Sequence, residues 1–162
     1  MNGRRVNRAT AALGVMAAVL AVSFCASAED KAMKRSTELV DALKKQSIPG
    51  LPATLTTEQA MEIEHGRTGP GGWFVEKGCF ACHSISVWGV KSYSQVGPDL
   101  STAVTDVKSR FGKDLDEFWH QPMGTMMMVR SSLIKLTPEE EAMALAKLKE
   151  AYAEYERQKS SK

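Results

Sequence analysis

"GCFACHS", residues 78–84, is the most distinctive stretch of the sequence. It holds two cysteines, Cys79 and Cys82, with two residues between them, and His83 follows directly. The chain of 162 residues contains one further cysteine, Cys25, far upstream. The chemistry of this stretch therefore has to work with one pair of thiols and a neighbouring imidazole.

Three chemistries use such a group. A redox-active disulfide needs a strand–turn–helix context, and the sequence shows no convincing alternating strand pattern. A closed zinc site needs four ligands, and the other histidines, His65 and His120, stand at no paired spacing. Covalent haem needs what is present: two thiols that add to the vinyl groups of the porphyrin, and an imidazole that ligates the iron. The motif therefore favours one covalently bound haem c on Cys79 and Cys82, with His83 as proximal ligand.

The N-terminus has the pattern of a secretory signal peptide. Three arginines among the first eight residues precede an uncharged apolar run over residues 11–24, and Ala26-Ser27-Ala28 provides a signal peptidase site. A membrane anchor is the alternative, but the run is shorter than the ~20 residues that a spanning helix needs. We expect cleavage after Ala28, export to the periplasm, and no transmembrane segment in the mature chain.

The charge of the mature chain differs from that of the precursor. The leader carries three of the 21 basic residues and none of the 19 acidic ones, so its removal leaves a net charge of −1. No basic block interleaved with aromatic residues is left, so the sequence does not support nucleic-acid binding.

The residues before the motif predict a helical N-terminal extension. Residues 32–46 have the periodicity of an amphipathic helix, residues 47–52 break it, and Thr56 with Gln59 predicts a capping box for a second helix. The extension either packs against the main domain or serves as a docking arm for a partner subunit. The glycines of residues 66–72 mark the domain boundary.

The rest of the chain predicts short helices and one long one, so the fold class is all-α. Residues 137–140, Thr-Pro-Glu-Glu, form a capping box with proline at the first helical position. The stripe Leu145, Leu148, Tyr152 and Tyr155 predicts the core face of that helix. Further short helices are expected at 73–77, 100–107 and 115–120, with a loop over 84–97. The expected domains are a signal peptide (1–28), an extension (29–66), the main domain (67–158) and a polar tail that frays (159–162).

The chain resembles the class I c-type cytochromes, small all-α proteins with one haem, over about residues 71–155. The resemblance rests on three features in order: Phe74-x-x-x-Gly78-Cys79-x-x-Cys82-His83, then Gly97-Pro98-Asp99-Leu100, then a methionine-bearing loop before a terminal helix. It implies a cytochrome c fold packed around the haem. It also implies that the carbonyl of Pro98 accepts a hydrogen bond from the far nitrogen of His83.

The distal ligand is sought in "HQPMGTMMMVR", residues 120–130. A thioether is a soft ligand that suits haem iron, although most methionines there can also be packing around the ring. In an extended segment alternate side chains face the same way, and on that basis Met126 is expected to bind iron. The alternatives are Met127, Met128, Met123 and, as a nitrogen ligand, His120.

These features predict an electron carrier and not an enzyme. A His/Met pair leaves no open position on the iron, so the protein would pass single electrons between redox protein partners. It could do so as a subunit of a larger membrane or periplasmic oxidoreductase. The alternative is a haem peroxidase or a diatomic-gas sensor with a labile distal methionine.

Overall fold

The structure is a computed structural model that describes residues 30–94 and 96–161. The predicted signal peptide and its cleavage site lie outside the described residues. The described part is mostly helical, with one isolated antiparallel bridge between Ile85 and Val90. Its elements after a first helix over residues 30–45 are α2 (Thr57–Thr68), α3 (Gly72–Glu76), η1 (Cys79–Ala81), η2 (Ser86–Trp88), η3 (Leu100–Thr102), α4 (Ala103–Phe111), α5 (Leu115–His120), α6 (Thr125–Met128), the π-helical stretch η4 (Val129–Leu133) and α7 (Pro138–Ser160). The all-α prediction is confirmed.

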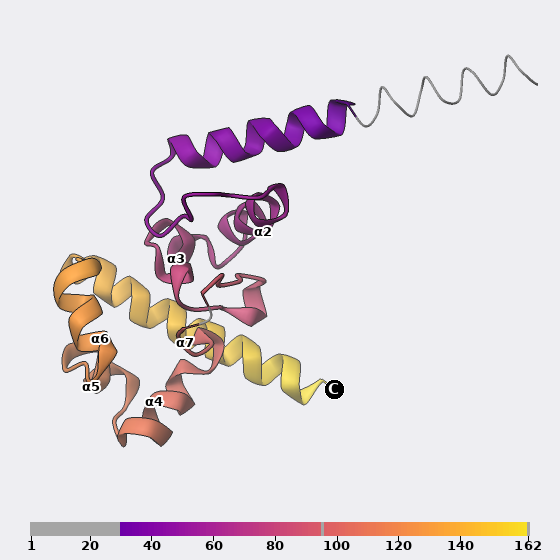
Figure 1. Ribbon diagram of the computed structural model, residues 1–162. Coiled ribbons are helices and arrows are strands. Elements are labelled where there is room, and N and C mark those ends of the chain that lie inside the picture. Colours follow the sequence, from indigo (N-terminus) through magenta and orange to yellow (C-terminus); the bar gives the residue numbers. More distant parts are fainter. Residues whose placement is uncertain (1–29, 95, 162) are drawn as a thin grey trace, which may run out of the picture.

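The long helix α7 is the element on which the second half of the chain packs (Figure 1). It contacts η2, η3, α4 and α5. Its start is the predicted capping box: the Glu140 amide donates to the Thr137 hydroxyl at 3.3 Å, and the Thr137 amide donates to the Glu140 carboxylate at 2.9 Å. The helix runs on to Ser160, so the first part of the polar tail that we expected to fray, Lys159 and Ser160, is helical.

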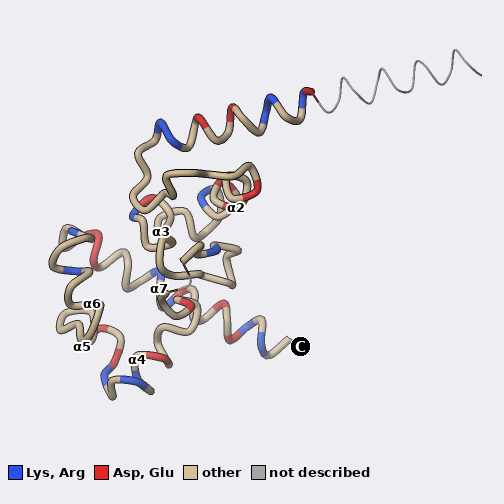
Figure 2. The backbone as a smooth tube through the Cα atoms, in the orientation of Figure 1, with Lys and Arg blue, Asp and Glu red and all other residues tan. Residues whose placement is uncertain are grey.

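The N-terminal extension packs against the rest of the chain at its end nearest the motif. Leu43 is fully buried, and Ile48 is buried beside it in the same core as Phe74 and Phe80. The first turns of the helix over residues 30–45 are exposed, and this helix projects from the body (Figure 1). Charges of both signs occur along it (Figure 2). The structure thus agrees with the packing interpretation for residues 43–48.

Three elements differ from those we expected. Helix α2 starts with the predicted Thr56–Gln59 capping box but continues to Thr68, so Gly66 lies inside it. Gly66 is buried because Val90 packs against the space where a side chain would stand. The helix expected at 100–107 runs to Phe111 and ends at Gly112, whose φ of 67° is left-handed. The expected loop over 84–97 contains η2.

Among the described residues, no helix is long and apolar enough to cross a membrane.

Candidate functional site

The two cysteines lie on one tight turn. Gly78, with a φ of 75°, ends the approach from α3 and opens η1. The carbonyl of Cys79 then accepts hydrogen bonds from the amides of Cys82, at 3.3 Å, and of His83, at 3.1 Å. Phe80 points into the core and is 1% exposed, which leaves Cys79 half-buried and Cys82 exposed. Both thiols are free of disulfides.

The environment of Cys79 does not suit thiol–disulfide exchange. Burial raises the pKa of the Cys79 thiol to about 11, whereas exchange requires a thiolate and reactive cysteines have lowered pKa values. The described residues also contain no strand–turn–helix unit around the motif. The redox-disulfide interpretation therefore has no support here.

The imidazole of His83 is oriented by Pro98. Its Nδ1 lies 2.8 Å from the carbonyl oxygen of Pro98. Because a carbonyl can only accept, Nδ1 carries a proton, and in the neutral ring Nε2 has the lone pair. This is the hydrogen bond that the resemblance implies, and such a contact fixes the ring and makes a histidine a better metal ligand.

Gly97 lies directly against the same imidazole. A methyl group at position 97 would stand 2.2 Å from Cε1 and 2.4 Å from Nδ1 of His83. Any side chain there would push the ring away from Pro98. Sequence reasoning named Gly97 as part of the Gly97–Leu100 motif but missed this role.

The segment that carries Pro98 is tied to the residues that follow the cysteines. The amide of Gly97 donates to the carbonyl of Cys82 at 2.9 Å, and that of Leu100 to the carbonyl of Ser84 at 2.8 Å. The Asp99 carboxylate accepts from the amides of Ser101, at 2.8 Å, and Ser86, at 3.2 Å.

The pKa of Asp99 reflects these bonds. Burial alone would raise it, but the hydrogen bonds from Ser86 and Ser101 outweigh burial and hold the pKa below its ordinary value. The carboxylate therefore stays ionised, and it keeps residues 97–101 against residues 82–86.

The methionine segment is not extended, so that part of our reasoning was wrong. Gly124, with φ 60° and ψ −139°, turns the chain into α6, and methionine is a good helix former. The segment therefore continues as helical turns through η4. Met126 is half-buried and packs against the core, while Met123, Met127 and Met128 are 45%, 57% and 62% exposed. The Nδ1–H of the exposed His120 donates to the carbonyl of Asp116, 2.7 Å away within its own helix.

Three buried polar atoms in the described part have no hydrogen-bond partner: the Tyr93 hydroxyl, the Trp119 indole nitrogen and one guanidinium nitrogen of Arg130. Tyr93 packs edge-on against Phe80 at 5.3 Å between ring centroids, and Arg130 lies 4.7 Å above the Trp119 ring. Buried donors of this kind are normally satisfied. Each of these atoms is suited to donate to a bound group that carries acceptors.

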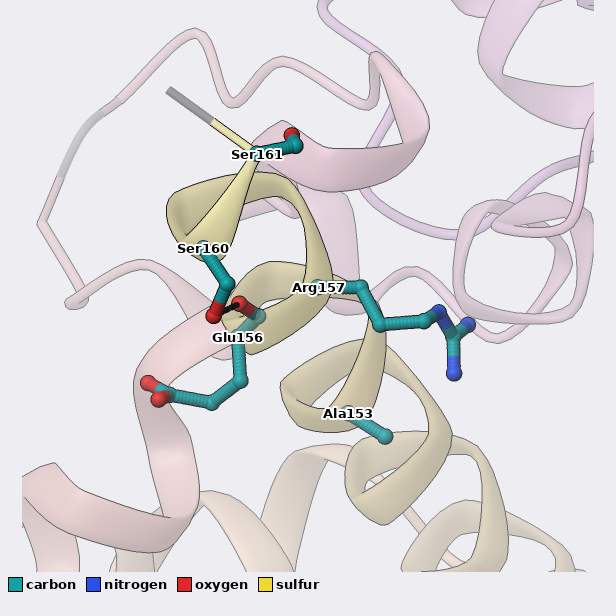
Figure 3. A pocket seen from close by; sticks show the side chains of 5 residues that line it. All are labelled: Ala153, Glu156, Arg157, Ser160 and Ser161. Carbon is teal, nitrogen blue, oxygen red and sulfur yellow. Dashed lines mark hydrogen bonds between the residues drawn. The ribbon is translucent and has the colours of Figure 1, made fainter.

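The cysteine turn does not form a metal site by itself. In the described ranges, no three His, Cys, Asp or Glu side chains are arranged to hold an ion, whereas closed zinc sites take four ligands. The hollow at the end of α7 contains none of the predicted site residues (Figure 3); it is lined by Ala153, Glu156, Arg157, Ser160 and Ser161.

Comparisons of the chain with family models, curated proteins and solved structures found no match.

Proposed function

We propose that this protein is an exported electron carrier with one haem bound covalently through Cys79 and Cys82. The observation that carries the proposal is an oriented imidazole directly after the cysteine turn. The Nδ1–H of His83 donates to the carbonyl of Pro98, 2.8 Å away. This bond leaves Nε2 available for iron. A disulfide exchanger does not need an oriented imidazole, and a closed zinc site would need a set of four ligands that the described residues do not bring together at the turn.

The chain's own residues have separate roles in this proposal. Bound haem supplies the change between Fe(II) and Fe(III). Cys79 and Cys82 hold the group, His83 binds its iron, and the Pro98 carbonyl sets the orientation and electron density of the imidazole. The unpartnered donors of Tyr93, Trp119 and Arg130 are suited to its carboxylates.

We propose Met126 as the distal ligand. The side-chain alternation on which we first chose it does not hold, because α6 is helical. Its partial burial is a new reason: of the four methionines it is the one that packs against the core. A methionine in that position raises the reduction potential and leaves no open site on the iron, which suits electron transfer between protein partners in the periplasm, alone or as a subunit of an oxidoreductase.

Two observations favour the second candidate function, a peroxidase or gas sensor. The other three methionines are highly exposed, and the segment passes through the π-helical stretch η4, a form that is often found at functional sites. If Met126 leaves the iron readily, peroxide or a diatomic gas could bind, and the protein would act as a peroxidase or a sensor.

The covalent site is tested on the full chain produced in a host that exports it and attaches haem. Acid–acetone extraction should leave the colour with the protein, and mass spectrometry should show the mass of one haem. Cys79→Ala or Cys82→Ala should reduce the number of thioether bonds, and His83→Ala should remove the normal low-spin iron. Extractable haem, or one zinc per chain in its place, would contradict the proposal.

The distal ligand is tested with four single variants. Met126→Ala should abolish the weak near-infrared band of ferric His/Met haem and lower the potential, since axial ligation is a main determinant within a range of ~0.8 V. Met123→Ala, Met127→Ala and Met128→Ala are the matched controls and should keep the band. Loss of the band in Met127→Ala alone would move the ligand by one residue. A parent that is five-coordinate and binds carbon monoxide rapidly would favour the enzyme or sensor.

A further inference from the structure

The N-terminal extension interlocks with the cysteine turn. Gly50 and Gly78 both have left-handed φ angles, 80° and 75°. A methyl group at position 50 would stand 2.5 Å from Cβ of Ala81, and one at position 78 would stand 2.8 Å from both Cβ and the carbonyl oxygen of Pro49. Each glycine thus provides the space that the other segment occupies.

This contact is anchored on both sides of the turn. On the extension side, the Pro49–Gly50 turn follows Ile48, which is 8% exposed in the core. On the other side, the carbonyl of Ala81 accepts from the hydroxyls of Ser92, at 3.3 Å, and Ser94, at 2.5 Å. Ala81, which directly precedes Cys82, is therefore held from both directions.

We propose that the Pro49–Gly50 turn is a positioning element for the attachment site. It holds the backbone of residues 79–82 in place, so that both thiols stay on one turn. It also sets the position of the His83 backbone, from which the ring reaches Gly97 and Pro98. The part of this inference that concerns haem rests on the proposed function. The positioning itself does not, because the contact involves the chain alone.

The test uses Gly50→Ala in the full chain. This variant introduces a left-handed alanine and a collision with Ala81. Gly112→Ala is the matched control, since Gly112 has a φ of 67° and nothing within 4 Å of the added methyl. Gly50→Ala combined with Ala81→Gly is the rescue, because it removes the atom that the new methyl would meet; Ala81→Gly alone completes the cycle.

The first readout is hydrogen exchange at the amides of Cys82 and His83, which both donate to the carbonyl of Cys79. We expect exchange to accelerate about tenfold in Gly50→Ala, a change of about 1.4 kcal/mol in local opening. It should stay near the parent rate in Gly112→Ala and return towards it in the double variant. Equal acceleration in Gly112→Ala, or none in Gly50→Ala, would overturn the proposal.

The second readout is the fraction of chains with both thioether bonds, measured by mass after digestion. It should fall in Gly50→Ala and recover in the double variant. A parent without covalent haem would contradict the proposed function, while the exchange rates would still decide the positioning. If Gly50→Ala does not fold, Pro49→Gly removes atoms that lie against Gly78 and adds none. It should accelerate the same two amides, and a parent-like rate in it would overturn the inference.

Discussion

Gly97 leaves no room for a side chain because the imidazole of His83 lies against it. Gly97→Ala should therefore displace the ring from Pro98 and lower the free energy of unfolding by about 1–3 kcal/mol, as overpacking does. Urea unfolding would measure the loss, and nitrogen-15 NMR of the His83 ring would show the loss of its bonded Nδ1 proton. Gly112→Ala, which adds a methyl in open space, should leave the His83 ring signals unchanged. A parent-like ring spectrum in Gly97→Ala would contradict the prediction.

The free energy of unfolding should depend on pH through Asp99. Its pKa is lowered in the folded state, so its contribution to stability is complete above the ordinary aspartate pKa of about 3.9 and is lost as the pH falls through the lower folded value. Asp99→Asn should be less stable than the parent at neutral pH. That difference should shrink as the pH falls below the ordinary aspartate pKa of about 3.9. Urea unfolding at stepped pH would measure it, and a difference that does not change with pH would argue against this role.

At the scale of single residues, the sequence led to a chemical hypothesis and to few of the contacts. The residue types and spacing of Cys79, Cys82 and His83 predict haem, which stays a prediction, and the Pro98 contact that the resemblance implied is present. The glycine against the ring was missed because a sequence does not state which atoms approach which glycine. The unpartnered donors of Trp119 and Arg130 were missed because the burial of these two side chains depends on how α5 and η4 pack.

Among the elements, the capping box of α7 allows a test of what fixes the start of this helix. Thr137→Ala removes the hydroxyl that accepts from the Glu140 amide and should cost about 1 kcal/mol of stability. Thr105→Ala is a suitable control, because the Thr105 hydroxyl donates to a carbonyl within its own helical region and caps no free amide. Thermal unfolding of both variants would measure the difference. Equal effects would show that the cap does not set the start of α7.

The capping boxes were predictable because each depends on residues three apart in the sequence. Helix α5 was predicted at its observed bounds, 115–120. The methionine segment was mispredicted because the resemblance suggested a loop, in which we took the side chains to alternate as they do in an extended chain. The three consecutive methionines instead lie in a helix that starts after Gly124 has turned the chain.

On α7, Leu145 and Leu148 are buried as expected, and Ala144 and Ala151 complete the core face. Tyr152 and Tyr155 are only half-buried and stack on each other.

For the whole molecule, the extension should be part of the folding unit. Leu43 is fully buried although it lies far before the cysteine motif. Leu43→Ala should lower the free energy of unfolding by about 2–5 kcal/mol, as for other buried leucines. Met33→Ala is the control on the same helix, since Met33 is 68% exposed, and it should change stability by less than about 0.5 kcal/mol. A small effect of Leu43→Ala would mean that the extension is only loosely attached.

The arrangement of the elements in space was predictable only in part. Local patterns gave an all-α chain with a long last helix, and the structure agrees. The interlock of Pro49 and Gly50 with Gly78 and Ala81 joins segments that are far apart in the sequence, and neither segment carries a signal for the other. Composition had placed a boundary at residues 66–72, but α2 runs into that stretch and packs on α3.

The chain has three tryptophans, and they lie on three different elements: Trp73 on α3, Trp88 on η2 and Trp119 on α5. Trp88 lies 6.3 Å from the Phe74 ring and has the ammonium of Lys147 of α7 5.9 Å from its own ring centroid. Each indole therefore gives an optical signal for its own region. In variants that keep one tryptophan at a time, fluorescence during urea unfolding would show whether α3, η2 and α5 unfold together or one after another.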